Sequence, residues 1–109
     1  MKRYEAHHHI EYIEKYRITE TTMVNPIIFH ILSLPEESRK SLDSLRTIWC
    51  GGVPLERDVQ NQFNDILHHD AVVSQVYGMT EVFWVTGFRV WEKDRTGSTG
   101  RLLPNMEAR

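Results

Sequence analysis

The sequence has a single cysteine, no long apolar run and no excess of positive charge. Cys50 has no partner for a disulfide within the chain, which favours a reducing compartment. No segment reaches the ~20 apolar residues of a membrane span, and Met1–Glu5 lacks the apolar core of a secretion signal. A net charge of −2 disfavours a nucleic-acid groove, which would need a basic surface. These absences predict a cytoplasmic chain of about one small domain.

Apolar residues alternate along the chain between strand-like and helix-like spacing. Short runs rich in Val, Ile and Thr predict strands over Thr19–Val24, Leu45–Cys50 and Val72–Val76. Amphipathic stretches predict helices around Tyr12, Phe29 and Phe63. Helices that alternate with strands form βαβ units, so we expect an α/β fold in which the three strands are parallel neighbours.

The remaining segments carry weaker signals. Pro35–Ser44 is typical of a loop with one helical turn, and Pro54 is expected to open the third helix, because proline suits a first turn. Val82–Trp91 indicates a fourth extended stretch, and the polar tail ends in what resembles the start of a strand. Parallel sheets need both faces covered, and few helices are available here. We therefore expect an incomplete domain.

Two predicted strands end in residues suited to a ligand. The second ends in Cys50-Gly51-Gly52-Val53-Pro54-Leu55, and the third in Ser74-Gln75-Val76-Tyr77-Gly78-Met79-Thr80-Glu81. Ligands bind at the carboxyl ends of strands in open α/β sheets, and paired glycines let a ligand approach the backbone. Tyr77 can stack on a ring, Thr80 can donate to phosphate, and Glu81 suits Mg²⁺. The alternative is a plain strand-to-helix turn, with Thr80 capping a following helix.

These segments, together with Gly97–Asn105, resemble the adenylate-forming (AMP-binding) superfamily, and most closely its acyl-CoA synthetases of the 4-coumarate–CoA ligase type. The motif Tyr77-Gly78-Met79-Thr80-Glu81 is highly specific in this context. Val24–Ile28 resembles the Val-Pro-Pro-Ile segment of such enzymes, and Tyr4–Thr19 the helix and strand that precede it. The resemblance spans almost the whole chain. Residues 1–109 would thus be a single incomplete AMP-binding (adenylation) domain, made of parallel βαβ units from the large N-terminal domain of such an enzyme.

The resemblance implies a fragment of an ATP-dependent acyl-CoA ligase. Such enzymes join a carboxylic acid to ATP as an acyl-adenylate, release pyrophosphate, and let the thiol of CoA displace AMP. ATP, Mg²⁺ and CoA are the implied cofactor and co-substrates, and the carboxylic acid is the partner. The carboxylate attacks the α-phosphorus, so catalysis rests on alignment and on neutralising phosphate charge.

Residue roles follow from the same resemblance. Thr80 and Glu81 would be catalytic, with Thr80 bonding the α-phosphate and Glu81 holding Mg²⁺. The ATP- and AMP-binding residues would be Gly52, Gln75, Val76, Tyr77, Gly78, Met79 and Thr80. The acyl group would meet Gly51, Gly52, Val53, Pro54 and Phe88.

The sequence also departs from the family pattern. Val76 stands where the family usually has glycine, which would narrow the acyl or adenine pocket, and Asn25 replaces the first proline of a Pro-Pro pair. The phosphate loop with its lysine, the ribose-binding aspartate and the C-terminal lysine of the family are not in the sequence, and Gly97–Arg101 lacks the phosphate-loop form. We expect the chain alone to be inactive.

Several alternatives remain open. The chain could be a non-catalytic truncated remnant or interaction module with the same fold, or part of a luciferase-like or other adenylating enzyme. A full-length parent with a C-terminal signal would be peroxisomal.

Three features suggest other kinds of site. His7–His9 with His68–His69 suggests zinc, but adjacent histidines on a helix point in different directions and no spacing resembles a structural site. Cys50 suggests a thiol nucleophile, although a cysteine at a strand end is more often a small buried hydrophobe. The aromatic residues between positions 84 and 91 suggest a nucleic-acid stacking platform, but the acidic balance favours core aromatics.

Overall fold

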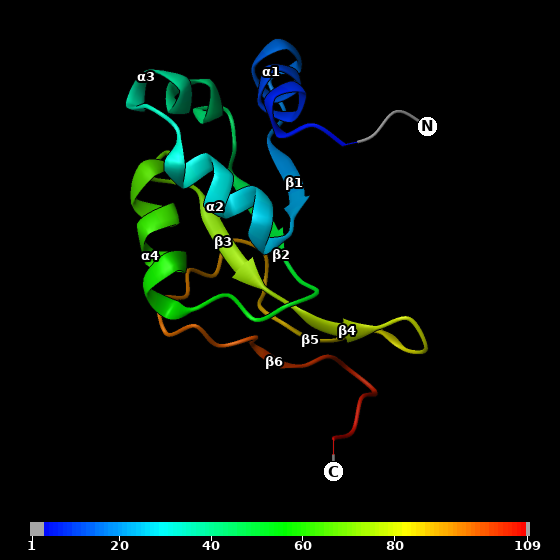
Figure 1. Cartoon of the computed structure of the whole chain (residues 1–109). Helices are drawn as coiled ribbons and strands as arrows, with labels where there is room; N and C mark the ends of the chain where they lie inside the picture. Colours follow the sequence, from blue (N-terminus) through cyan, green and yellow to red (C-terminus); the bar gives the residue numbers. More distant parts are fainter. Residues whose placement is uncertain (1–3, 109) are drawn as a thin grey trace.

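Two small sheets and a group of helices make up residues 4–108, the part of the chain that the computed structural model describes (Figure 1). The helices are α1 (Ala6–Tyr16), α2 (Asn25–Ser33), α3 (Glu36–Arg39) and α4 (Arg57–Ile66), with a 3₁₀ turn η1 (Lys40–Leu42). The strands are β1 (Glu20–Met23), β2 (Thr47–Cys50), β3 (Val72–Gln75), β4 (Tyr77–Met79), β5 (Phe83–Gly87) and β6 (Arg101–Leu102). None of the described helices is long and apolar enough to cross a bilayer.

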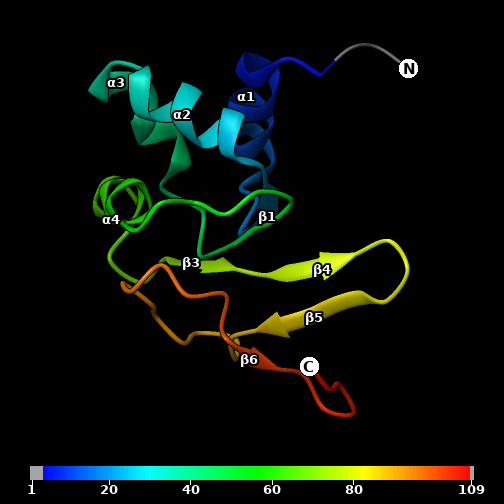
Figure 2. The ribbon, with the colours of Figure 1, turned by 60° about the horizontal axis from the view of Figure 1, so that its bottom comes forward.

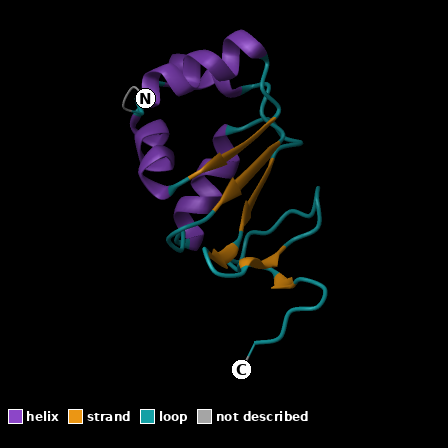
Figure 3. Cartoon of the chain, turned by 90° about the vertical axis from the view of Figure 1, so that its right-hand side faces the viewer, coloured by secondary structure: helices purple, strands orange, loops and turns teal. Residues whose placement is uncertain are grey.

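The first sheet contains β1, β2 and β3 in that order, and all its strands are parallel. Glu20 pairs with Thr47 at one end, and Cys50 pairs with Gln75 at the other. Helix α2 connects β1 to β2, α4 connects β2 to β3, and the helices lie on one side of the sheet (Figure 3). This arrangement confirms the predicted parallel neighbours and βαβ units.

Local sequence explains where the two crossover helices begin. Helix α2 opens with Asn25-Pro26, where proline removes an N–H that would have no helical partner, and it buries Ile28 and Ile31. Helix α4 begins at Arg57 rather than at the predicted Pro54, because the chain first turns inward to bury Leu55. The α4 residues Gln60 and Phe63, three positions apart, then face the core.

The core lies between the helices and the parallel sheet. Its side chains come from α1, α2, α4, the loop before β2 and the strands themselves. The largest fully buried members include Phe63, Ile48 and Met23. Cys50 belongs to the same cluster, which matches the interpretation of this cysteine as a buried hydrophobe.

The second sheet differs from what the sequence predicts. Strand β3 ends at Gln75, and after Val76 alone the chain continues as β4, which pairs with β5 in an antiparallel hairpin. The hairpin extends away from the helices (Figure 2). The third strand therefore stays in the parallel sheet, and the residues after it form a hairpin with the fourth extended stretch. Gly78 permits their close approach, because a Cβ there would overlap the carbonyl oxygen of Phe83.

The tail closes this second sheet. Strand β6 pairs with β5 in antiparallel fashion, as expected of a segment that resembles the start of a strand. The loop before β6 is held by Asp94, whose carboxylate accepts hydrogen bonds from Thr96 and from the Gly97 N–H. Glu92 forms a two-point ion pair with Arg101, at 2.7 and 2.9 Å. The predicted turn at 97–100 is thus a structural connection.

Candidate functional site

The carboxyl ends of β2 and β3 meet at one edge, and the residues that follow them surround a shallow groove. The Val76 N–H donates to the Cys50 carbonyl over 2.8 Å, which keeps the two chain segments side by side past the strand ends. One hollow of about 120 Å³ is lined by Gly52, Val53, Pro54, Gln75, Val76, Tyr77, Gly78 and Thr99. A second, of about 350 Å³, is lined by Gly51, Gly52, Val76, Gly78, Met79, Thr80, Phe83 and Trp84. We call these two hollows together the Gly52 groove.

The groove gathers most of the residues that the sequence singles out. Gly52 and Tyr77 share the smaller hollow, and Gly52 and Thr80 share the larger one. Glu81 follows Thr80 in the hairpin turn and lines neither hollow. Phe88 also lies outside both. The roles assigned by resemblance remain predictions, but the expected grouping of Gly52, Tyr77 and Thr80 is present.

Gly52 presents bare backbone to the groove. Its φ is +92°, and no atom lies within 4 Å of the position that a Cβ would occupy. Such a conformation strains any residue with a side chain, and the open space leaves the peptide accessible. A planar or phosphorylated ligand can therefore approach the main chain here.

The amide of Gln75 is committed to the protein interior. Its Oε1 accepts from the Leu55 N–H, and its Nε2 donates to the Leu55 carbonyl, each over 2.8 Å. Nε2 also reaches Gln60 Oε1 at 2.9 Å and the Gly97 carbonyl at 3.3 Å. Gln60 in turn donates to the Val73 carbonyl at 3.0 Å. This buried amide network joins the loop after Gly52 to β3, α4 and the tail, so Gln75 can border a ligand mainly through its backbone.

Thr80 and Glu81 occupy the turn of the β4–β5 hairpin, closed by a 3.2 Å hydrogen bond from the Val82 N–H to the Met79 carbonyl. Both side chains are exposed. A strand follows this turn, so the alternative in which Thr80 caps a helix is wrong. No ion pair within residues 4–108 involves Glu81, so its carboxylate is available to a cation. Mg²⁺ is commonly held by one or two carboxylates with waters and phosphate oxygens completing its shell, and Glu81 fits that requirement.

A third hollow lies beyond Gly51, at the carboxyl ends of β1 and β2. It measures about 310 Å³ and is lined by Thr22, Met23, Val24, Ile27, Trp49, Gly51, Gly52, Val76 and Trp84. We call it the tryptophan hollow. Sequence reasoning missed Trp49 and Trp84 as lining residues. The position of Trp49 near the end of the second predicted strand could have indicated it, whereas Trp84 is brought here by the hairpin.

Val76 stands between the Gly52 groove and the tryptophan hollow. One of its methyl groups lies 3.2 Å from the position that a Cβ on Gly51 would occupy, and the other lies 3.8 Å from that of Gly87. Its side chain thus fills space between two glycines. The expectation that Val76 narrows the acyl or adenine pocket remains a prediction.

The thiol of Cys50 is unsuited to nucleophilic chemistry. Burial raises its pKa to about 12, so at neutral pH the sulfur is protonated. A reactive cysteine needs thiolate character and exposure. The thiol-nucleophile interpretation is therefore not supported.

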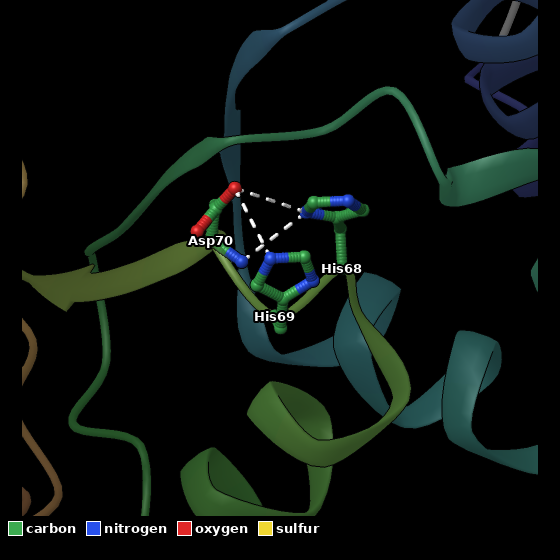
Figure 4. A group of neighbouring side chains, drawn as sticks. All are labelled: His68, His69 and Asp70. Atoms are coloured by element: carbon green, nitrogen blue, oxygen red, sulfur yellow. Dashed lines mark hydrogen bonds and ion pairs between the residues drawn. The ribbon is translucent and has the colours of Figure 1, made fainter.

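His68, His69 and Asp70 form a cluster in the turn after α4 (Figure 4). Their potential ligand atoms lie within 4.8 Å of one another, and the two rings are 4.2 Å apart. The expectation that adjacent histidines diverge is wrong for this pair, because they lie in a turn rather than on a helix. However, the Asp70 N–H occupies His68 Nδ1, and the ammonium group of Lys93 donates to the His69 carbonyl. A nearby cation and an exposed position make this a poor metal site.

The cluster also lies at the opposite end of the parallel sheet from the Gly52 groove. It precedes β3, at the amino end of the parallel sheet, whereas the Gly52 groove lies at the carboxyl end. The two features therefore belong to opposite edges of the same sheet.

Comparisons with known proteins agree on one family. A family model described as AMP-binding enzyme matches residues 1–109. Two proteins of Aspergillus niger, an acyl-CoA ligase (azaF) and a phenylacetyl-CoA ligase (epaB), are each 42% identical over 113 residues, which cover 100% of this chain and 21% of each relative. The chain thus spans about a fifth of the length of these curated relatives.

Solved structures show the same fold. An acyl-CoA synthetase from Brucella canis superposes with a TM-score of 0.80 at 24% identity, over 94% of this chain and 19% of that one. A luciferase-like enzyme from the Zophobas morio mealworm superposes with a TM-score of 0.77 at 25% identity, over 93% of this chain and 25% of that one.

Proposed function

The chain belongs to the AMP-binding enzyme family, and from this premise we propose that it forms one wall of the adenylation site of an ATP-dependent acyl-CoA ligase. The observation that carries the proposal is the Gly52 groove. Gly52 presents open backbone to both hollows, Tyr77 lines the smaller one and Thr80 the larger one. Both hollows lie at the carboxyl edge of a parallel sheet, where ligands of α/β folds bind.

Each group in the groove has a task in forming an acyl-adenylate. Tyr77 and the peptide at Gly78 offer a surface for the adenine, and Gly52 lets the ligand lie against the main chain. The oxygen of the acid attacks the α-phosphorus, so negative charge develops on the phosphate oxygens, and the Thr80 hydroxyl can donate to one of them. Glu81 would hold Mg²⁺, which neutralises phosphate charge when bound. The thiol of CoA would then take the acyl group and release AMP.

The groove provides only one side of such a site. Within residues 4–108, no lysine or arginine lines either of its hollows. Phosphate chemistry needs donors and cations aimed at the developing charge from several directions. We therefore propose that the 109-residue chain alone does not form acyl-adenylate at a useful rate.

The test uses the segment in a complete enzyme. The matching 113 residues of the Aspergillus niger acyl-CoA ligase azaF are replaced by this chain, and acid-dependent ATP–pyrophosphate exchange is measured with aryl and fatty acids. We expect exchange by the chimera, and a loss of ~10²–10³ when Thr80→Ala is introduced, the usual effect of removing one preorganised donor. Glu81→Ala should raise the Mg²⁺ concentration required.

Two controls make the result decisive. A cooperative thermal melt shows that each chimera is folded, and the isolated chain is assayed beside its own Thr80→Ala, Glu81→Ala double variant. A folded chimera whose ATP–pyrophosphate exchange is no faster than that of the isolated chain's double variant would support the alternative of a non-catalytic remnant. Exchange by the isolated chain clearly above that of its double variant would show that this groove alone can form acyl-adenylate.

A further inference from the structure

The tryptophan hollow is a second binding space that opens beside the Gly52 groove. Most of its lining is apolar, and among the described residues that form it Thr22 and the two indole N–H groups are the polar side-chain groups. The rings of Trp49 and Trp84 lie 5.4 Å apart, tilted by 47°. They come from β2 and β5, so the hollow exists only because the hairpin folds back beside the parallel sheet.

We propose that this hollow holds the acyl part of the acid substrate and selects a compact, uncharged aromatic group, such as a single ring on a short linker. The inference rests on the proposed function and adds the substrate class to it. Trp49 and Trp84 are the specificity-determining residues, and Val76 sets the size limit.

The indole of Trp49 offers aromatic surface rather than a hydrogen bond. The Trp49 N–H already donates to the Glu20 carboxylate at 2.6 Å, so its ring has no donor left for a ligand. Aromatic pairs favour tilted or offset contacts with centroids ~4.5–7 Å apart, and the two indoles already have such a tilted geometry. A third ring entering the hollow finds the same kind of partner.

The position of the hollow connects it to the chemistry. Gly51, Gly52, Val76 and Trp84 line both the tryptophan hollow and the larger part of the Gly52 groove. An acid whose ring lies against Trp84 therefore directs its carboxylate towards Gly52 and the Thr80 side of the groove. There the carboxylate oxygen forms a bond to the α-phosphorus of ATP while the bond from that phosphorus to the bridging oxygen breaks, and pyrophosphate leaves with both electrons.

Size and charge disfavour other acids. A volume of about 310 Å³ lies at the lower end of the ~300–1,000 Å³ typical of ligand pockets, which disfavours a long acyl chain. No lysine, arginine or histidine of the described chain lines the hollow. A second carboxylate would be desolvated there without a partner, which is costly. The contact of Val76 with Gly51 limits growth in that direction.

Direct binding tests the inference on the chain itself. The sequence has three tryptophans, and Trp91 lies outside the hollow, so Trp91→Phe leaves Trp49 and Trp84 as the only reporters. Fluorescence of this variant is titrated with phenylacetate, octanoate and succinate. We expect saturable quenching by phenylacetate with a Kd about tenfold below that for octanoate, and no saturation by succinate. Trp84→Ala in the same background should abolish the preference.

The chimera then tests selectivity during turnover. Trp84→Ala should lower kcat/KM for phenylacetate about tenfold while sparing octanoate, and the matched variant Trp91→Ala, which removes another exposed tryptophan, should change neither. Val76→Ala should raise kcat/KM for naphthylacetate relative to phenylacetate about tenfold, the usual effect of a small change in pocket size.

The outcomes separate the two proposals. Exchange with octanoate that equals or exceeds exchange with phenylacetate, and that ignores Trp84→Ala, overturns the inference and leaves the proposed function standing. A folded chimera without exchange on any acid overturns the proposed function, and the fluorescence titration then decides whether the hollow binds aromatic acids. Equal binding of phenylacetate and octanoate in that titration overturns the inference.

Discussion

The two sheets of this chain differ in almost every physical respect. In the parallel sheet, all four residues of β3 and three of four in β2 are buried, whereas the edge strand β1 buries only Met23. In the antiparallel sheet all of β4 is exposed, and only Gly87 of β5 is buried. The parallel sheet packs against the helices to form the core, whereas the hairpin carries Tyr77, Thr80 and Glu81. Ligand-contacting segments commonly belong to the less stable parts of a fold, and the hairpin carries several of the residues that we propose to contact the ligand.

The same division appears in single residues. Phe63 on α4 is 0% exposed, and Phe83 at the start of β5 is 83% exposed. Identical side chains thus have opposite environments on the two sides of the molecule. Pairs of this kind allow the contrast between the sheets to be measured directly.

The largest expected effect comes from truncating these two phenylalanines. Phe63→Ala should lower the free energy of unfolding by ~3–5 kcal/mol, because it leaves a cavity in the core. Phe83→Ala should change it by no more than ~0.5 kcal/mol, as for most exposed positions. Urea unfolding followed by circular dichroism measures both. Similar losses for the two variants would show that the hairpin contributes to the core.

A second test breaks the link between the sheets. Gln75→Leu removes the amide that bonds Leu55, Gln60 and Gly97, leaving buried groups without partners at ~1–3 kcal/mol each. We expect destabilisation of about 2–4 kcal/mol, since not every group can find water.

Gln62→Leu on the exposed face of α4 is the matched control, and we expect little change from it. In the chimera, Gln75→Leu should also weaken AMP binding, because the loop after Gly52 loses its anchor. Unchanged stability for Gln75→Leu would mean that the amide network is replaceable.

A third test perturbs the hairpin alone. Gly78→Ala places a methyl group against the Phe83 carbonyl, so β4 and β5 must separate, at a cost of ~1–3 kcal/mol typical of overpacking. Hydrogen exchange should show lost protection in β4 and β5 and retained protection in β1, β2 and β3. Loss of protection in both sheets would indicate that they unfold as one unit.

The smallest effect concerns pH. The guanidinium of Arg101, together with the Arg89 N–H, lowers the pKa of Glu92 from 4.5 to about 2. A lowered carboxyl pKa contributes stability that is present above pH 4.5 and is lost as the pH falls towards 2. Because Arg101 is exposed and Glu92 is partly exposed, solvent screens the pair, and the change in stability should be slight and confined to the second sheet.

Carboxyl NMR titration of Glu92 measures this pKa, with Arg101→Gln as the variant that should return it towards 4.5. A pKa already near 4.5 in the unaltered chain would show that the ion pair does not persist in solution.

The parallel sheet was predictable because its strands are short β-branched runs separated by amphipathic helices, and the burial of Ile48 and Phe63 follows from the same periodicity. The grouping of Gly52 with Tyr77 was predictable from the rule that parallel strand ends meet. The hairpin was not, because its turn at 80–82 contains none of the Gly, Asn or Pro residues that mark tight turns.

Periodicity and turn residues do not predict buried polar networks or hollows that are lined by several elements. A glutamine such as Gln75 can face a ligand or the interior, and its neighbours in sequence do not decide which. The pairing of Trp49 with Trp84 depends on the path of a hairpin that the sequence does not announce. Tertiary placement, rather than local preference, determines both.

Val76 is the single residue between β3 and β4. A change in its backbone angles would rotate the hairpin relative to the parallel sheet. Four residue steps along the chain lead from it to Thr80, a span of roughly 13 Å at ~3.3 Å per residue. A rotation of about 10° at Val76 displaces the far end by roughly 2 Å, comparable with the margin between a hydrogen bond and no contact. The Val76 side chain, packed between Gly51 and Gly87, therefore influences the position of the Thr80 hydroxyl through the backbone.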